Sequence, residues 1–160
     1  MVFPRFSFAY FENMDVRIFG VLAFLVPLMA RGIPEILMGK HIAGFDTISY
    51  YVPVTLKLVN GGTSFLEFTA YAPLFYALLT ALTLTGVPLN VSLKLLPTAL
   101  HGLLGLAIYL YARKALEWSY KKSLFVSCLA TLYFVALRIS WDMLRNELGL
   151  IFLFVFLIFF

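Results

Sequence analysis

The chain has 160 residues, of which 62% are hydrophobic and only 12% are charged. A soluble domain carries about 25% charged residues, so this chain has too few polar groups to cover its own surface and needs lipid to cover part of it. The formal charge of +4 is small and scattered, which argues against a nucleic-acid partner. The single Cys128 leaves no disulfide framework and is expected to be a small core residue.

Apolar runs bounded by charged residues follow one another along the chain: Ile18–Ala30, Phe68–Leu89, Val91–Ala112, Ser123–Leu137 and Leu148–Phe160. The first lacks a small-residue cleavage site, so we expect a retained membrane anchor rather than a signal peptide. The last has thirteen residues and no polar flank, and it reaches only ~20 Å across a ~30 Å hydrocarbon core. We therefore expect residues 1–160 to form a single transmembrane domain, the N-terminal part of a larger protein.

Basic residues predict the orientation of these runs. The hairpin at residues 113–122 contains Arg113, Lys114, Lys121 and Lys122, and the positive-inside rule places it in the cytoplasm. Arg5 and Arg17 place the N-terminus there too. If every run crossed the membrane, however, the basic hairpin would follow three crossings and lie outside.

The conflict disappears if one run does not span, and Phe68–Leu89 is the best candidate because it contains Pro73, Gly86 and Pro88. We predict that this run forms a helix in or along the outer leaflet. The other four runs are then the transmembrane helices of an all-α bundle. Two polar segments, 31–67 and 138–147, fall together on the outer face of a cell membrane.

The first outer segment is expected to be a loop followed by a surface helix. Apolar residues from Ile48 to Val59 recur at helical spacing, and Asn60-Gly61-Gly62 supplies a stop. A helix with one apolar face at the membrane surface fits this pattern, which Pro53 is expected to shorten or kink.

Asp46 stands directly before this helix, close to Tyr50 and Tyr51. Asp is a preferred helix N-cap, and capping is one interpretation. The other is a functional carboxylate at the membrane surface, which takes a proton from a hydroxyl or holds a divalent cation. Both interpretations stay open at this point.

The second outer segment is rich in charge. It contains Arg138, Trp141, Asp142, Arg145, Asn146 and Glu147. Arg138, Asp142 and Arg145 have the spacing of an ion-pair ladder on one helix face, with Trp141 as an interfacial aromatic. Ionisable residues at membrane depth are equally candidates for a functional site.

Two further polar residues lie in the run Val91–Ala112. His101 is expected to be a hydrogen-bonded packing residue rather than a metal ligand. Lys94 is expected either to extend toward the interface or to meet a phosphate there. Asn90-Val91-Ser92 matches a glycosylation sequon, a short and weak motif so close to the bilayer.

The order of these features resembles the front end of the GT-C superfamily of polyprenyl-phosphate-dependent glycosyltransferases, particularly relatives of protein mannosyltransferases and aminoarabinose transferases. The residues that carry the resemblance are Gly44–Tyr51 (GFDTISYY), Tyr71–Leu79 (YAPLFYALL) and Trp141–Glu147 (WDMLRNE). Many family members carry paired acids where this chain has Asp46-Thr47. The resemblance implies a GT-C-like bundle of about four transmembrane helices with two lateral helices at the outer leaflet.

The resemblance also implies an activity, the transfer of a sugar from a polyprenyl-phosphate carrier to an acceptor at the outer face of the membrane. Asp46 would be the general base, with or without a divalent cation. The substrate-binding residues would be Tyr50, Tyr51, Lys94, Arg138, Asp142, Arg145, Asn146 and Glu147. The partners would be the bilayer and the lipid-linked sugar. The alternative is a non-catalytic membrane subunit or transporter fragment, whose outer charges gate or bind a partner.

A last prediction concerns the two outer clusters. Neither cluster balances its own charges, and unpaired charge at the edge of the hydrocarbon is costly. We therefore expect the Asp46 carboxylate to lie within one long side chain's reach of the segment Asp142–Glu147, and both clusters to face a common cavity.

Overall fold

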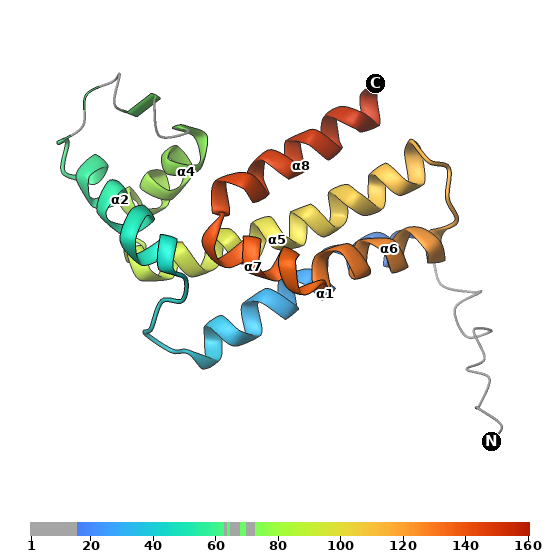
Figure 1. The fold of residues 1–160 in the computed structure, drawn as a ribbon, viewed down its shortest axis with the longest axis horizontal. Helices are drawn as coiled ribbons and strands as arrows, with labels where there is room; N and C mark the ends of the chain where they lie inside the picture. Colours follow the sequence, from blue (N-terminus) through green and yellow to red (C-terminus); the bar gives the residue numbers. More distant parts are fainter. Residues whose placement is uncertain (1–15, 63, 65–67, 70–72) are drawn as a thin grey trace.

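The computed structural model describes residues 16–62, 64, 68–69 and 73–160, and these residues form helices and no strand (Figure 1). The elements in chain order are α1 (Val16–Leu37), the π-helical turn η2 (Thr47–Tyr51), α2 (Val52–Val59), α4 (Pro73–Leu84), α5 (Leu89–Lys114), α6 (Tyr120–Leu132), α7 (Phe134–Asp142) and α8 (Leu144–Phe159).

Among the described residues, two helices are long and apolar enough to cross a membrane, α1 over Arg17–Leu37 and the whole of α5. A third span results if α6 and α7, which meet at a bend of 58°, count as one. Helix α8 has 16 residues and rises only ~24 Å, less than the ~30 Å hydrocarbon core. The described part of the chain is thus an all-helical bundle with two or three of the four predicted spans.

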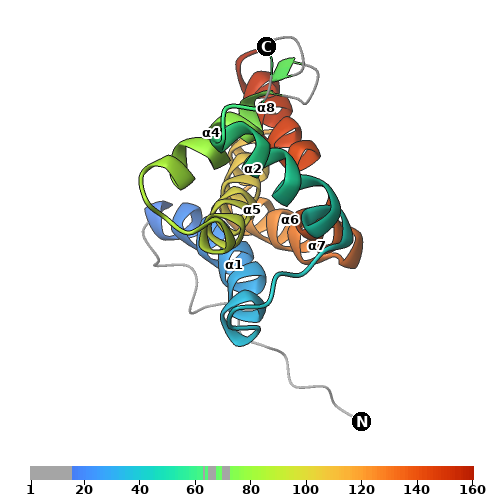
Figure 2. The ribbon, with the colours of Figure 1, turned by 90° about the vertical axis from the view of Figure 1, so that its left-hand side faces the viewer.

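Helix α5 lies at the centre of the bundle and packs against α1, α6 and α8 (Figure 2). Glycines bring α1 and α5 close together, because a Cβ added to Gly105 would lie 2.4 Å from the Ala23 carbonyl oxygen. A Cβ on Gly102 would lie 2.8 Å from the Phe24 ring. Small residues at helix contacts of this kind are common in membrane proteins.

The prediction that the first span ends at Ala30 is wrong. Helix α1 continues through Arg31 and Glu35 to Leu37, and the loop begins only after it. The charged residues led to a boundary that is too early, because the Arg31 and Glu35 side chains are buried inside the bundle, with exposures of 2% and 5%. They also form an ion pair one helical turn apart, so neither charge faces lipid alone.

The helix predicted over Ile48–Val59 is confirmed as η2 and α2, and it ends at Asn60 before Gly61, whose φ is +70°. Its position at a membrane surface stays a prediction. Pro53 lies in the first turn of α2, where its missing N–H is tolerated. Tyr51 packs edge-to-face against Phe75 of α4, with ring centroids 5.2 Å apart.

The run Phe68–Leu89 contains no helix of spanning length among its described residues. Helix α4 has 12 residues and rises ~18 Å, and the chain turns at Gly86, whose φ is +92°. The predicted break near Gly86 is confirmed. Tyr71 and Ala72, the first two residues of the segment Tyr71–Leu79 that carries part of the resemblance, lie outside the described residues.

The predicted continuous span Ser123–Leu137 is interrupted. Helix α6 ends at Leu132, Tyr133 is extended, and α7 begins at Phe134. The segment 138–147, which the charge pattern placed between two spans, is itself helical: its first half ends α7 and its second half begins α8. The break between them is at Met143, whose φ and ψ are −109° and 52°.

Candidate functional site

A buried ion-pair network joins α1, α5 and α7 around Glu35. Its Oε1 atom accepts hydrogen bonds from the Arg31 guanidinium and from Trp141 Nε1, the latter at 3.1 Å. The ammonium of Lys94 lies 3.3 Å from Oε2. A buried carboxylate is stable only when such partners surround it, so Glu35 ties three helices together at one place.

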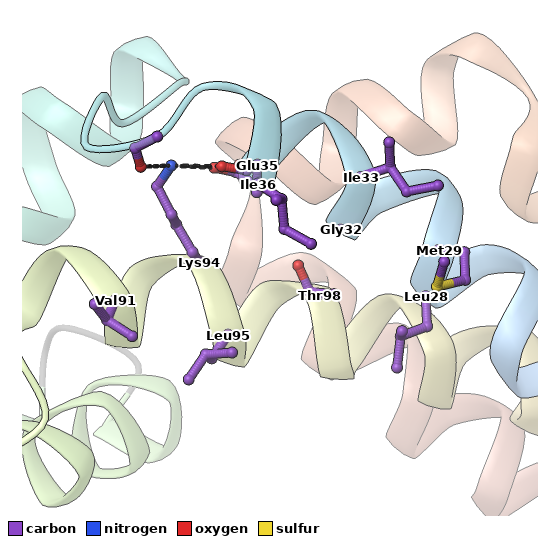
Figure 3. A pocket seen from close by; sticks show the side chains of 11 residues that line it. Leu28, Met29, Gly32, Ile33, Glu35, Ile36, Val91, Lys94, Leu95 and Thr98 are labelled. Atoms are coloured by element: carbon purple, nitrogen blue, oxygen red, sulfur yellow. Dashed lines mark hydrogen bonds and ion pairs between the residues drawn. The ribbon is translucent and has the colours of Figure 1, made fainter.

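Lys94 is fully engaged by α1 and the residues that follow it. Its Nζ donates hydrogen bonds to the carbonyl oxygens of Glu35 at 2.8 Å and Gly39 at 2.9 Å (Figure 3). The last carbonyls of a helix have no partners within the helix, and a cation there also interacts favourably with the helix dipole. Lys94 therefore caps the C-terminal end of α1, and its three donors are directed at protein acceptors.

Arg31 fixes the end of α7. Its Nε donates to the Ser140 carbonyl oxygen at 3.2 Å, and its guanidinium carbon lies 4.8 Å from the centroid of the Trp141 ring. The hydrogen bond and the cation–π contact hold the last turn of α7 against α1. The Asp142 carboxylate, which follows directly, is placed by the same contacts.

The loop before η2 docks on this end of α7. The Thr47 hydroxyl donates to the Trp141 carbonyl oxygen at 2.8 Å, and the Asp46 backbone N–H donates to Asp142 Oδ1 at 3.3 Å. Arg138 Nε binds the other oxygen, Asp142 Oδ2, at 2.7 Å. The prediction that Asp46 lies close to the segment Asp142–Glu147 is confirmed, since the Asp46 backbone N–H contacts Asp142. That both clusters face a common cavity stays a prediction.

The Asp46 side chain does not cap the helix that follows it. Asp46 has helical φ and ψ of −67° and −31°, and its carboxylate makes no capping hydrogen bond. The capping interpretation is therefore wrong. The Asp46 residue is partly exposed, and its backbone N–H is held by Asp142. Its carboxylate makes no hydrogen bond to another described residue.

The predicted ion-pair ladder of Arg138, Asp142 and Arg145 is only partly right: the first pair forms, and the prediction is wrong for Arg145. Arg138 and Asp142 form an ion pair in α7, but the break at Met143 turns Arg145 away from that helix face. The guanidinium of Arg145 instead lies 6.0 Å from the centroid of the Tyr51 ring. It also lines a groove of about 240 Å³ between α4 and α8, whose walls include Phe75, Leu148 and Phe152.

The remaining predicted site residues lie in different surroundings. Tyr50 and Asn146 are exposed, whereas Tyr51 is buried in the core beside Phe75. Glu147 is fully buried, and its Oε1 lies 2.6 Å from His101 Nδ1 of α5. The structure therefore brings Asp46, Asp142 and Arg138 together but places Glu147 in a separate contact with His101.

The His101–Glu147 contact holds a proton between its partners. His101 Nε2 lies 3.2 Å from the Thr131 carbonyl oxygen, which only accepts, so Nε2 is the donor. The 2.6 Å contact at Nδ1 then requires a proton either on His101 or on Glu147. In both cases the pair is neutral overall, and His101 is a hydrogen-bonded packing residue, as predicted.

Two features bear on modification and metal binding. Ser92 of the sequon is fully buried in the first turns of α5, where a helical backbone does not present an acceptor. Across the described ranges, no three His, Cys, Asp or Glu side chains are grouped closely enough to hold a metal ion.

Arg31 and Glu35 are members of the site that sequence reasoning missed. Their signal was their spacing of four residues, together with the apolar residues Ile33, Ile36 and Leu37 that continue the run beyond Arg31. Paired charges at this spacing neutralise each other on one helix face, and such a pair extends a span instead of ending it.

Comparison with protein-family models, with curated proteins and with solved structures finds no match. The chemistry of the site therefore has to be argued from its own groups. These are the Asp46 carboxylate, which makes no capping hydrogen bond, the ion pair of Asp142 and Arg138 beside it, and the Arg145 guanidinium in the wall of an apolar groove.

Proposed function

We propose that the protein is a membrane glycosyltransferase that moves a sugar from a polyprenyl-phosphate carrier to an acceptor hydroxyl at the membrane surface. The observation that carries the proposal is the docking of the Asp46 segment on the end of α7. This contact fixes a carboxylate in place while leaving its oxygens free for chemistry, which is what a general base requires.

In the proposed reaction the acceptor oxygen attacks the anomeric carbon of the sugar. The acceptor's proton passes to the Asp46 carboxylate, a new glycosidic bond forms, and the bond between the anomeric carbon and the phosphate oxygen breaks. The polyprenyl phosphate leaves with the electron pair of that bond. Holding base, acceptor and donor in line supplies much of the rate, and a cation near the departing phosphate supplies more.

Arg145 is the cation that suits the departing phosphate best. Its side chain is exposed and stands beside the apolar groove between α4 and α8. Such a groove suits a polyprenyl chain, and the guanidinium at its wall suits a phosphate. Lys94 is less suitable because α1 already occupies its donors. Arg138 is held by Asp142 but is otherwise exposed.

The test replaces Asp46 by Asn in the full-length protein, reconstituted in vesicles with polyprenyl-phosphate-linked mannose or aminoarabinose. We expect Asp46→Asn to lower the release of polyprenyl phosphate by ~100-fold or more, the usual effect of losing a general base. Glu117→Gln, at an exposed acid in the basic hairpin, is the matched control and should keep full activity. Unchanged release with Asp46→Asn would overturn the mechanism.

A non-catalytic membrane subunit is the second candidate, and the pairing of the charges favours it. Arg31, Glu35 and Lys94 satisfy one another, as do Arg138 and Asp142. A network built only to hold helices together would have the same contacts. For such a protein the vesicles would release no polyprenyl phosphate with either the wild type or the Asp46 variant.

A further inference from the structure

A second apolar groove, separate from the one beside Arg145, runs between α1 and α5. Its volume is about 390 Å³, and Figure 3 shows its walls formed by Leu28, Met29, Ile33 and Ile36 of α1 and by Leu95 of α5. Gly32 of α1 and Thr98 of α5 face each other between the two helices, and a Cβ on Gly32 would lie 3.0 Å from the Thr98 methyl group. Asp46, Asp142 and Arg145 are not among its lining residues, so it is not part of the proposed catalytic site.

The lining of this groove suits the hydrocarbon chains of membrane lipids. Both helices that form it are long and apolar enough to span a membrane, and several lining side chains, including Met29, Ile33 and Leu95, are exposed. A groove between such helices opens to the bilayer core. Water does not fill an apolar space of this kind, because it would find no hydrogen-bond partners there.

The polar end of the groove is basic. Lys94 and Glu35 lie at this end, and Gly39, which also lines it, is followed by the exposed Lys40. Glu35 is the one acid that lines the groove. It is shared by Arg31 and Lys94, so these three side chains together keep one net positive charge. The exposed Lys40 adds a second, and this excess favours a negatively charged headgroup.

We propose that this groove binds one anionic diacyl phospholipid of the bilayer. One acyl chain lies between α1 and α5, and the phosphate lies beside Lys40 and Lys94. Lys94 attracts it by charge alone, since its donors are directed at Glu35 and Gly39. Lys40 supplies the free hydrogen-bond donors. The bound lipid fills the space between two helices and strengthens their contact at the end nearest the candidate site.

The experiment counts lipids that stay bound to the full-length protein during native mass spectrometry. The protein is purified from mixed micelles that contain equal amounts of phosphatidylglycerol and phosphatidylcholine with the same acyl chains. We expect one phosphatidylglycerol to be retained in preference to phosphatidylcholine. Lys40→Gln should lower that preference about fivefold, the contribution of one basic side chain near an anionic headgroup.

A pair of tryptophan variants tests the position of the lipid. Leu95→Trp places a large ring in the groove, whereas Leu103→Trp makes the same change at another exposed position of α5. We expect Leu95→Trp to lose the retained lipid and Leu103→Trp to keep it, with equal circular dichroism spectra for both. Retention by Leu95→Trp would overturn the groove as the site.

Two other results would overturn the choice of ligand. Equal retention of the two phospholipids would remove the role of charge. Displacement of phosphatidylglycerol by an equimolar amount of polyprenyl phosphate would make the groove a carrier site. Lipid retention does not depend on sugar transfer, so the proposed enzymatic function and this lipid site can fail separately.

Discussion

Gly44 is the residue on which the docking of the Asp46 loop depends. Its φ of +101° lies in a region that residues with a side chain rarely adopt, and an added Cβ would lie 2.6 Å from the Trp141 carbonyl oxygen. The same Cβ would lie 2.9 Å from Asp142 Oδ1. A side chain at this position would therefore displace the loop from the atoms that hold Thr47 and the Asp46 backbone.

We expect Gly44→Ala to release residues 41–47 from α7 and to speed their amide hydrogen exchange by tenfold or more. Gly61→Ala is the matched control, since Gly61 also has a positive φ, +70°, but its Cβ would meet nothing within 4 Å. Both variants carry a backbone cost of ~1–2 kcal/mol, and only Gly44→Ala adds the clash. Equal exchange of residues 41–47 in the two variants would show that the contact does not hold the loop.

Sequence reasoning found part of the candidate site and missed another part for a physical reason. The proximity of Asp46 to Asp142 was predictable, because both follow apolar runs that the charge pattern places on one face of the membrane. Arg31 and Glu35 were assigned to a loop, because the rule that charge ends a span considers each charge alone. Their burial depends on Trp141, Ser140 and Lys94, partners distant in sequence.

At the scale of the helices, side-chain contacts from α5 stabilise the break between α6 and α7. A helix that ends at Leu132 leaves its last carbonyl oxygens without partners. His101 of α5 donates to one of them, on Thr131, and on its other side contacts Glu147 of α8. One imidazole thus connects α5, α6 and α8.

We expect His101→Leu to lower the free energy of unfolding by ~3–5 kcal/mol, because it leaves Glu147 buried without its partner. His101→Leu combined with Glu147→Met should be less destabilised than His101→Leu alone, since the double variant buries no unpaired carboxyl group. Denaturant unfolding in mixed micelles measures both.

The exposed His41 provides the control for this series. His41→Leu should change stability by less than ~0.5 kcal/mol, as surface substitutions usually do. A double variant that is less stable than His101→Leu would contradict the role given to the pair.

The position of this break could not be read from the sequence. The residues around it, Thr131, Leu132, Tyr133 and Phe134, include neither proline nor glycine, which are the usual local signals of a helix break. The break near Gly86 was predictable because its glycine and proline act locally. The break after Leu132 is stabilised by His101, thirty residues earlier in the chain, and a local pattern carries no trace of such a contact.

At the scale of the whole molecule, the loop after α1 and the basic hairpin 113–122 lie at opposite ends of α5. The charge pattern predicts that they lie on opposite sides of the membrane. The loop after α1 meets α5 at Lys94, near its first residues, while the basic hairpin follows its last residue, Lys114. The 26 residues of α5 rise ~39 Å, enough to separate these segments by the thickness of a bilayer. The antiparallel course of α1 brings Phe19 to the hairpin end, where it stacks on Tyr120.

Single cysteines in a Cys128→Ala background test this orientation in intact cells. We expect Glu117→Cys in the hairpin to be shielded from a membrane-impermeant maleimide, and Lys40→Cys in the loop to react with it. Both positions are exposed in the structure, so burial does not explain a difference between them. After permeabilisation both should react. The reverse pattern in intact cells would show that the basic hairpin is outside.

The pairing of Arg31 with Glu35 has a consequence for biosynthesis. Helix α1 leaves the ribosome before Lys94, Ser140 and Trp141 are made, so its two charges meet the membrane before those partners exist. A lone charge costs ~2.5–3.5 kcal/mol on insertion at the centre of a span, and less toward the end of the span, where Arg31 and Glu35 lie. Because the two side chains lie one turn apart, the charge of Arg31 is balanced within α1 itself. The helices made later then close around a pair that is already formed.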